Sequence, residues 1–366
     1  MPEIHAERRA ALAEDLRQAE LDALLVTELT NIRYLAGFTG SNAALLLHAD
    51  GDGQTLFCTD GRYTTQAGVE VPDLEHVLDR ASAVALAGRA ASEPARYAQV
   101  GFESRHVSVD EHDKLAETAA GVALRRAPGL VEKLRMVKDT GEIEALRMAC
   151  AVADRALAEL VSHGDLRAGR SEREVARDLE NRMLENGSDG VSFETIVAAG
   201  VNSAVPHHRP SQAALAEGDL VKLDFGATVD GYHSDMTRMF VLGKPADWQR
   251  ELYDLVYRAQ LSGCAAAVPG AEVSKVDAAA RTVIEQGGHG EEFSHGLGHG
   301  VGLRVHEAPQ LSKTGVGTLA AGMAVTVEPG VYLAGRGGVR IEDTMIVRDG
   351  AAEILSLSTK ELVVVS

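Results

Sequence analysis

The sequence has few cysteines, and their arrangement limits the possible classes of protein. There are three in 366 residues, Cys58, Cys150 and Cys264, and they are far apart and form no Cys-x-x-Cys motif. An odd number of widely spaced cysteines argues against a disulfide framework and is typical of a reducing compartment. We therefore expect three core thiols in a cytoplasmic protein.

Runs of basic residues and long apolar runs are also missing. The formal net charge is −18, so a nucleic-acid backbone or an anionic membrane surface would repel the chain. No segment approaches the roughly 20 uncharged apolar residues of a membrane-spanning helix, and the N-terminal residues lack the apolar centre of a signal peptide. We expect a soluble intracellular protein that binds neither nucleic acid nor membranes.

The length and the pattern of the chain predict two domains. With 366 residues, 45% of them hydrophobic, the chain exceeds the usual size of one hydrophobic core. Up to about residue 129, short apolar strands alternate with helical segments, as in an α/β domain. A charged connector then runs into a long helix. We place the boundary there and predict domains at 1–131 and 132–366.

The second domain is predicted to combine helices with a largely antiparallel sheet. Ser171 and Glu174 have the spacing of a capping box at the start of a helix that ends at residue 185. Two more helices are predicted at 248–267 and 272–286, stopped by Pro-Gly and Gly-Gly. Strands are predicted at 195–199, 323–328, 339–347 and 362–365.

A hairpin at residues 221–242 is the strongest local signal in this domain. Its two arms are rich in apolar and β-branched residues, and the Asp-Gly pair at 230–231 is typical of a two-residue hairpin turn. We therefore pair Val229 with Tyr232. This register decides which side chains share a face, and a slip of one residue would reverse the faces.

Two acids of the hairpin, Asp224 and Asp235, are predicted to share one face. The register sets Gly226 opposite Asp235, and Asp224 lies two residues further along the same strand. Such diagonal neighbours are about 7–8 Å apart at the backbone. Their side chains can converge on an ion, with Gly226 leaving the space free. A solvated hairpin is the alternative interpretation, since Asp is common near turns.

A glycine-rich segment surrounds His299. Residues 295–302 read HGLGHGVG, and alternating glycines would let the backbone approach whatever the imidazole binds. We favour a ligand-binding turn here over a flexible loop. No dinucleotide-binding fingerprint fits these glycines.

Two further acids lie at or in apolar strands. Glu328 ends the strand AVTVE directly before Pro-Gly, so it is either a strand-end cap or a ligand. Glu342 lies within the strand predicted at 339–347, where the two-residue period places it on one face with Arg340. Two interpretations of Glu342 are open: it forms an ion pair with Arg340, or it binds a metal ion and is oriented by Arg340.

Together these side chains make a candidate metal site. It consists of four carboxylates and one imidazole, namely Asp224, Asp235, Glu328, Glu342 and His299. Mostly oxygen ligands with one nitrogen suit divalent ions such as Mn²⁺, Co²⁺ or Zn²⁺. Without cations, several of four clustered buried acids would have to keep their protons. Two divalent ions would balance the charge, and two metals suggest activation of water beside a polarised carbonyl.

The order of these motifs resembles the Xaa-Pro peptidases of the pita-bread metallopeptidase family M24. This group includes aminopeptidase P and prolidase and, more distantly, methionine aminopeptidase and creatinase. The second domain carries the resemblance in the segments NSAVPHHRP (202–210), LDFG (223–226), SDMTR (234–238), HGLGHGVGLRVHEAP (295–309), VEPGVY (327–332) and RIED (340–343). The first domain resembles the creatinase-type N-terminal domain less specifically, at 31–41 and 59–67.

The resemblance implies a fold class of α/β (α+β) type. A creatinase-type N-terminal α/β domain would precede a pita-bread catalytic domain with a curved, mostly antiparallel sheet flanked by helices. It also implies that Asp224 binds one metal, that Asp235 and Glu342 bridge both, and that His299 and Glu328 complete the second. The two ions, Mn²⁺ in preference to Co²⁺ or Zn²⁺, would activate water for attack on the carbonyl before proline, with Glu328 as general base.

Three histidines match those that surround the substrate in this family. We expect His306 to help hold the developing oxyanion and His207 to assist near the prolyl nitrogen or the leaving group. His295 is the third. Arg340 would orient ligands or substrate. We interpret His208, the neighbour of His207, as a partly exposed loop residue.

The implied function is a dinuclear metallo-exopeptidase, either an Xaa-Pro aminopeptidase or an Xaa-Pro dipeptidase, and the family suggests a homodimer. The catalytic motifs do not separate these two activities. First-domain loops near 33–41 or 60–66, from the same or a partner subunit, would decide how long a peptide fits. The alternative is a creatinase-like hydrolase or an inactive peptide-binding module, which the intact ligand set disfavours. Methionine aminopeptidase is disfavoured by the large first domain and by HEAP at 306–309.

Overall fold

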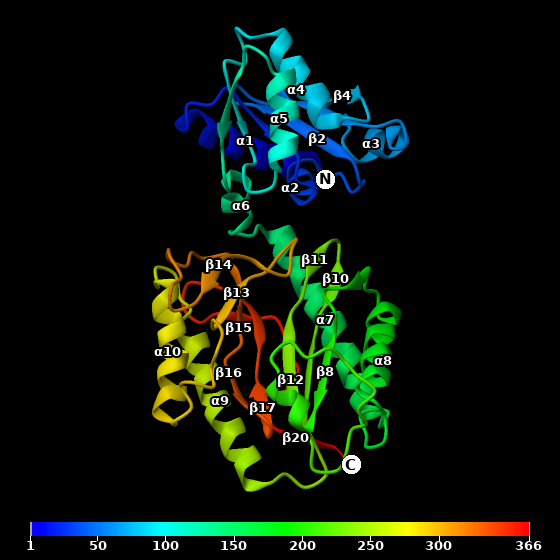
Figure 1. Ribbon diagram of the computed structural model, residues 1–366, viewed down its shortest axis with the longest axis vertical. Helices are drawn as coiled ribbons and strands as arrows, with labels where there is room; N and C mark the ends of the chain where they lie inside the picture. Colours follow the sequence, from blue (N-terminus) through cyan, green and yellow to red (C-terminus); the bar gives the residue numbers. More distant parts are fainter. Residues whose placement is uncertain (1, 366) are drawn as a thin grey trace. The chain divides into compact units, whose positions relative to one another are not determined.

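The computed structural model describes residues 2–365 of the chain. The chain divides into two compact units, Met1–Arg135 and Met136–Ser366, and each combines helices with strands (Figure 1). The predicted fold class is confirmed, with an α/β first unit and a second unit of mostly antiparallel strands flanked by helices. The boundary predicted between residues 131 and 132 falls inside a short helix and stays a prediction. None of the helices in the described part has the length and apolar character needed to cross a membrane.

The first unit contains one six-stranded sheet in the order β4-β3-β2-β1-β5-β6. Its elements, with η for a 3-10 helix, are α1 (Pro2–Gln18), β1 (Ala23–Val26), α2 (Leu29–Ala36), β2 (Ala43–His48), η1 (Asp52–Gln54), β3 (Leu56–Thr59), α3 (Thr64–Glu70), β4 (Glu75–Leu78), α4 (Ser82–Ser92), β5 (Gln99–Phe102), α5 (Val109–Thr118), β6 (Ala123–Arg126) and α6 (Leu130–Arg135).

Both faces of this sheet are buried at its centre. Leu25 and Leu46 lie in the core that α4 and α5 share with the sheet. Their neighbours Leu24 and Leu45 are equally buried and point to the opposite face by the two-residue period, where α1 and α2 contact β2. Burial on both faces explains why these strands are continuous apolar runs in the sequence.

The second unit carries most of the antiparallel pairing. Its elements are α7 (Thr140–Ser162), α8 (Glu172–Glu185), β7 (Gly190–Val191), β8 (Ile196–Ala199), η2 (Gly200–Ala204), β9 (Leu220–Phe225), β10 (Ala227–Val229), β11 (Tyr232–His233), β12 (Met236–Leu242), α9 (Asp247–Ala266), α10 (Val273–Gln286), β13 (Gly298–Gly300), β14 (Glu307–Leu311), β15 (Ala324–Val327), β16 (Gly330–Leu333), β17 (Gly337–Arg340), β18 (Asp343–Ile346), β19 (Glu353–Ile354) and β20 (Val363–Val365).

Two helix pairs flank the strands of the second unit, with α7 and α8 on one side and α9 and α10 on the other (Figure 1). The larger sheets have the orders β20-β12-β9-β8 and β14-β13-β15-β18-β19. The capping box predicted at α8 is confirmed, because Ser171 accepts a hydrogen bond from the Glu174 amide and the Glu174 carboxylate accepts one from the Ser171 amide.

Alternation along β9 separates a core face from an interior polar face. Val221, Leu223 and Phe225 pack in the core that contains residues of α7 and α8. The intervening residues Lys222 and Asp224 therefore point to the opposite side, and both are buried there. This strand places a carboxylate in the interior of the unit while its other face holds the strand against the helices.

The predicted hairpin register is confirmed. Val229 pairs with Tyr232 across the turn, and the same register continues into β9 and β12, where Asp224 lies opposite Thr237. Asp235, two residues before Thr237, is thus a diagonal neighbour of Asp224. The acids share a face, as the sequence predicts.

The role predicted for Gly226 is different in the structure. A Cβ at this position would lie 1.9 Å from the Ser234 carbonyl oxygen and 2.8 Å from the Ser192 Cβ. Gly226 therefore allows the two arms of the hairpin to approach each other closely. The space it leaves is filled by backbone, not by an ion between the acids.

The prediction of a single strand at 339–347 is wrong. The segment divides into β17, which pairs with β16, and β18, which pairs with β15 and β19. Glu342 lies between these strands, and its amide donates to the Thr237 carbonyl at 3.3 Å. The whole segment is buried, and the adjacent acids Glu342 and Asp343 interrupt its two-residue alternation at the point where the chain leaves one sheet for another.

The contact at Gly226 predicts a large cost for Gly226→Ala. The added methyl group must displace backbone of the opposite arm, which typically costs about 1–3 kcal/mol and lowers the Tm by about 2–4 °C per kcal/mol for a unit of this size. Gly190→Ala in β7 is the matched control, because a Cβ there would meet no other described residue within 4 Å beyond its chain neighbours. Thermal unfolding of both variants checks this, and equal Tm values would contradict the assigned role of Gly226.

Candidate metal centre

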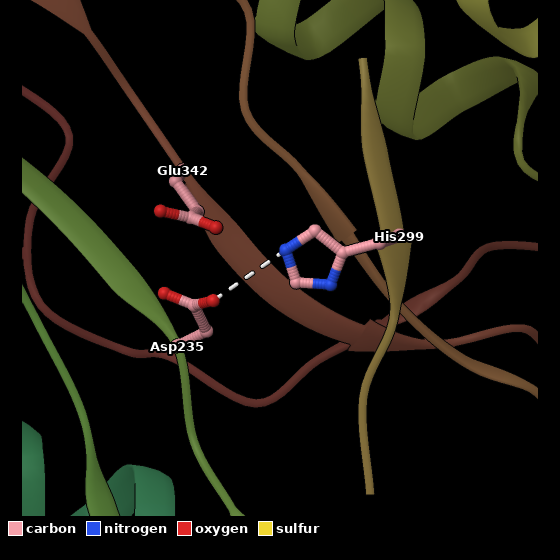
Figure 2. Close-up of side chains that lie close together, drawn as sticks. All are labelled: Asp235, His299 and Glu342. Atoms are coloured by element: carbon pink, nitrogen blue, oxygen red, sulfur yellow. Dashed lines mark ion pairs between the residues drawn. The ribbon is translucent and has the colours of Figure 1, made fainter. Parts of the chain in front are cut away.

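Five side chains predicted as metal ligands meet in one pocket of the second unit. Each comes from a different place along the chain: Asp224 from β9, Asp235 from the residue before β12, His299 from β13, Glu328 from the residue after β15, and Glu342 from the link between β17 and β18. All five line a pocket of about 360 Å³. Figure 2 shows three of them, Asp235, His299 and Glu342, pointing toward one another from separate strands and links.

His299 lies at the centre of the short distances in this cluster. Its Nε2 is 3.3 Å from Glu328 Oε1 and 3.6 Å from Asp235 Oδ2, the latter drawn in Figure 2. Its Nδ1 donates to the Gly300 carbonyl at 3.0 Å, which directs Nε2 toward the acids. One ligand atom each from Asp235, His299 and Glu342 lie within 4.8 Å of one another. This spacing suits one cation shared by all three.

Two carboxylate oxygens of the cluster have no partner in the described structure. They are Asp224 Oδ1 and Glu342 Oε1, both buried. A buried polar atom without a hydrogen bond is costly, and such atoms are rare in native proteins. Orphaned anionic oxygens in a pocket of acids are the donor set of a hard or borderline divalent cation. The residues present therefore fit a metal centre.

Arg340 contacts two of the acids, one directly and one through a threonine. It forms a salt bridge with Asp224 and donates from Nε to Thr237 Oγ1 at 3.0 Å. Thr237 in turn donates to Glu342 Oε2 at 2.6 Å. The link from Arg340 to Glu342 thus runs through Thr237, and the ion pair goes to Asp224. Of the two interpretations that the sequence left open, an orienting role for Arg340 agrees with these contacts.

The cluster favours bound protons when no cation is present. Burial raises the pKa of Asp224, and burial together with neighbouring carboxylates raises the pKa values of Asp235 and Glu342 well above the usual range. Burial also acts on Glu328, but the hydrogen bond and charge of His299 lower its pKa to about 2. The pKa of His299 is raised in return, against the effect of its burial. In metal-free protein Glu328 is therefore ionised beside His299, whereas Asp235 and Glu342 resist ionisation.

The three histidines expected near the substrate all line the same pocket. The His306 ring centroid is 4.3 Å from that of His299. His295 Nε2 lies 2.9 Å from the Tyr332 hydroxyl, which also accepts from Arg340 at 2.8 Å. Burial lowers the pKa of both His295 and His306, so both are neutral hydrogen-bonding groups near pH 7.

His207 and His208 are neighbours with different surroundings. His207 is exposed and lines the pocket. His208 is half-buried and its Nε2 lies 2.7 Å from Oε2 of Glu172, which is fully buried. The interpretation of His208 as a loop residue missed this contact, because Glu172 lies 36 positions earlier in the chain.

The glycines beside His299 give room to neighbouring backbone. A Cβ on Gly298 would lie 2.0 Å from the Thr326 carbonyl oxygen, and one on Gly300 would lie 2.1 Å from that of Ala308. His299 is held in strand β13 of a sheet, so the turn expected at this residue is wrong, whereas ligand binding by His299 stays a prediction. The glycines do allow a close approach of the backbone, as predicted. What approaches them is the backbone of adjacent chain segments.

Sequence reasoning missed several residues that shape the site. Thr237 connects Arg340 to Glu342, and Tyr332 connects Arg340 to His295. Phe193 and Ile196 supply apolar surface to the pocket. Thr237 could have been found, since it shares the face of Asp235 by the two-residue period. The others have no such signal, although Tyr332 lies only eight positions before its partner Arg340.

The comparisons with known proteins agree with this geometry. A model of metallopeptidase family M24 matches residues 144–349, and a model of the creatinase/prolidase N-terminal domain matches residues 8–137. An uncharacterised peptidase, YqhT, of Bacillus subtilis is 37% identical over 347 residues, which cover 95% of this chain and 97% of that protein.

Two solved structures resemble the chain over almost its whole length. An Xaa-Pro dipeptidase from Bacillus anthracis has a TM-score of 0.93 at 37% identity, with coverage of 98% of this chain and 99% of that one. An X-Pro aminopeptidase from Thermotoga maritima has a TM-score of 0.87 at 34% identity, with coverage of 97% and 98%.

The raised pKa values predict that stabilisation by a divalent cation grows with pH. A carboxyl whose pKa is raised by folding favours the folded state at low pH, and this contribution is lost as the pH rises through the folded pKa. A cation replaces these protons, so the rise in Tm caused by Mn²⁺ over chelator should be larger at about pH 7.5 than at about pH 5, where carboxyl protons compete.

Asp235→Asn sharpens this test. It removes one charge from the repelling cluster, so metal-free protein should be at least as stable as wild type near neutral pH, while the Mn²⁺-dependent rise in Tm should be lost. Glu285→Gln, at an exposed acid on α10, is the matched control and should behave as wild type. A metal-dependent rise that is unchanged in Asp235→Asn would contradict the proposed cluster.

Proposed function

The chain belongs to metallopeptidase family M24, and from this membership and the pocket we propose that it is a metal-dependent exopeptidase that hydrolyses the bond between an N-terminal residue and a following proline. The single observation that carries the proposal is the convergence of four carboxylates and one imidazole, with two carboxylate oxygens orphaned, in one pocket. The names of the dipeptidase and aminopeptidase relatives supply the proline specificity.

The alternative, an inactive module or a hydrolase without metals, is not favoured. A pocket that had lost its cations would be expected to lose some of the acids as well, since their burial together is unfavourable. Here all five side chains are present and buried or nearly so, with Glu328 the most exposed at 16%. Their retention supports an active centre.

We assign the ligands by the family pattern. Asp224 would hold one ion, His299 and Glu328 would hold the second, and Asp235 and Glu342 would contribute to both. The distances around His299 and the proximity of Asp235 and Glu342 support this division. We propose Mn²⁺ as the ion, with Co²⁺ and Zn²⁺ as other occupants that the oxygen-rich set accepts.

When bound, the ions supply a nucleophile at neutral pH and polarise the scissile carbonyl. Glu328, which lines the pocket beside His299, accepts the proton of the attacking water as general base. His306 lies beside His299 and donates to the developing oxyanion. His207 acts near the prolyl nitrogen. His295 is held by Tyr332 and lines the same pocket.

Arg340 keeps the acids in place during these steps. Its contacts with Asp224 and Thr237 fix two carboxylates in one arrangement. Such supporting hydrogen bonds typically change metal affinity or activity by about 10–100-fold. We also propose a cytoplasmic homodimer, on the family resemblance and the unpaired cysteines.

The proposal predicts metal-dependent release of the residue before proline. Chelator-stripped protein should be inactive toward Ala-Pro and Ala-Pro-Ala, and added Mn²⁺ should restore release of alanine. Ala-Ala-Ala is the matched control without proline. Cleavage of the dipeptide alone identifies a dipeptidase, and cleavage of the tripeptide as well identifies an aminopeptidase. Confirmed metal binding without cleavage of either peptide would overturn the proposal.

Glu328→Gln tests the assignment of the general base. The amide cannot accept the proton, so kcat should fall by at least about 100-fold on whichever peptide the wild type cleaves. Glu285→Gln is the control and should keep wild-type kcat. Metal content measured on the same samples separates loss of the base from loss of an ion, and a variant that keeps more than about a tenth of the wild-type kcat would contradict the assignment.

A further inference from the structure

A buried lysine lies next to the metal pocket without pairing to its acids. Lys222 is fully buried on β9, two residues before Asp224, yet Asp224 forms its salt bridge with Arg340. The Lys222 Nζ donates instead to three backbone carbonyls, Val205 at 2.7 Å, Pro206 at 3.0 Å and Ser203 at 3.4 Å. Burying an amino group costs free energy unless hydrogen bonds compensate it, and these three carbonyls supply them.

These carbonyls belong to the segment that carries His207. Arg340 donates to the same Pro206 carbonyl at 3.2 Å. Burial lowers the pKa of Lys222 to about 6, but an amine without its charge still has two N–H donors for the two short contacts. The main chain directly before His207 is therefore held from inside the unit.

A buried glutamate holds the same segment at its two ends. Glu172 is fully buried, and its Oε2 accepts hydrogen bonds from the Ser211 amide at 3.0 Å and the Ser211 hydroxyl at 2.7 Å and lies 2.7 Å from His208 Nε2. Its Oε1 accepts from the Ala199 amide and the Asn202 side chain, both at 2.9 Å. One carboxylate thus ties together both ends of residues 199–211.

His207 is the residue between the two anchors. The carbonyl before it is held by Lys222, and the side chain after it is held by Glu172. His207 itself is exposed and lines the pocket with His295 and His306. An exposed side chain on a loop gains a fixed position only if its backbone is fixed.

We propose that Lys222 and Glu172 are positioning residues that clamp residues 199–211, Lys222 at the middle of the segment and Glu172 at its two ends, and so hold His207 against the metal pocket. The proposal rests on the proposed function for the role of His207 in catalysis. Neither residue touches substrate. Both act through the backbone of one loop, and a misplacement of about 1 Å at a catalytic group can cost about 100-fold in rate.

A double-mutant cycle tests the clamp with the Mn²⁺-loaded full-length enzyme and Ala-Pro-Ala. Lys222→Met, which keeps the length of the side chain, should lower kcat/KM by about 10–100-fold. Lys222→Met combined with His207→Ala should match His207→Ala alone within about twofold, because the lysine acts through that histidine. Lys275→Met, at an exposed lysine of α10, is the matched control and should leave kcat/KM unchanged.

Three results would overturn the proposal. They are wild-type kcat/KM in Lys222→Met, losses that multiply in the double variant, and a loss of bound metal that accounts for the loss of rate, which would mean that Lys222 acts through Asp224. Glu172→Gln weakens the contacts at the two ends of the loop at nearly constant volume and must show the same non-additivity with His207→Ala. It carries the test if Lys222→Met does not fold.

Hydrogen exchange separates this proposal from the proposed function. Amides of residues 200–211 should exchange about tenfold faster in Lys222→Met or Glu172→Gln than in wild type or Lys275→Met, while β9 exchanges as before. This holds whether or not the protein cleaves Xaa-Pro peptides. Unchanged exchange would overturn the clamp, and inactive wild-type protein with faster exchange in the variants would overturn only the peptidase assignment.

Discussion

Repulsion among buried carboxylates is the constraint on which the second unit depends. Asp224, Asp235 and Glu342 are brought together away from water, where each makes its neighbours harder to ionise. Cationic and hydrogen-bonding groups reduce this repulsion. Arg340 pairs with Asp224, and Thr237 links Arg340 to Glu342. What is left over is a pair of orphaned oxygens in a pocket that a divalent cation would satisfy.

The acids also join two hydrophobic cores. Asp224 and Asp235 are presented by strands that pack on α7 and α8, whereas His299 and Glu328 adjoin strands that pack on α9 and α10. Neither core alone contains a complete set of ligands. A cation at this junction would be bound by both halves, which connects the stability of the unit to the occupancy of its centre.

The sequence predicted the parts of the site that follow from local rules. The Asp-Gly turn determined the register of the hairpin, and the register placed Asp224 and Asp235 on one face. The split between β17 and β18 was missed, although the adjacent acids Glu342 and Asp343 interrupt the two-residue alternation at the change of sheet. Lys222 was also missed, since its partners are backbone carbonyls 16 to 19 positions earlier, and carbonyls have no sequence signature.

The glycines of this site have a consequence for how its specificity can evolve. Gly226, Gly298 and Gly300 face backbone of adjacent segments, with no room for even a methyl group. Of the three, Gly298 lines the pocket, and the wall there is closed to variation, because any larger residue would have to move a whole strand. Only the walls made of side chains, such as Phe193, Ile196 and Val305, can be exchanged singly. New substrate preferences in descendants of this protein would therefore arise along that apolar rim, while the ligand side stays fixed.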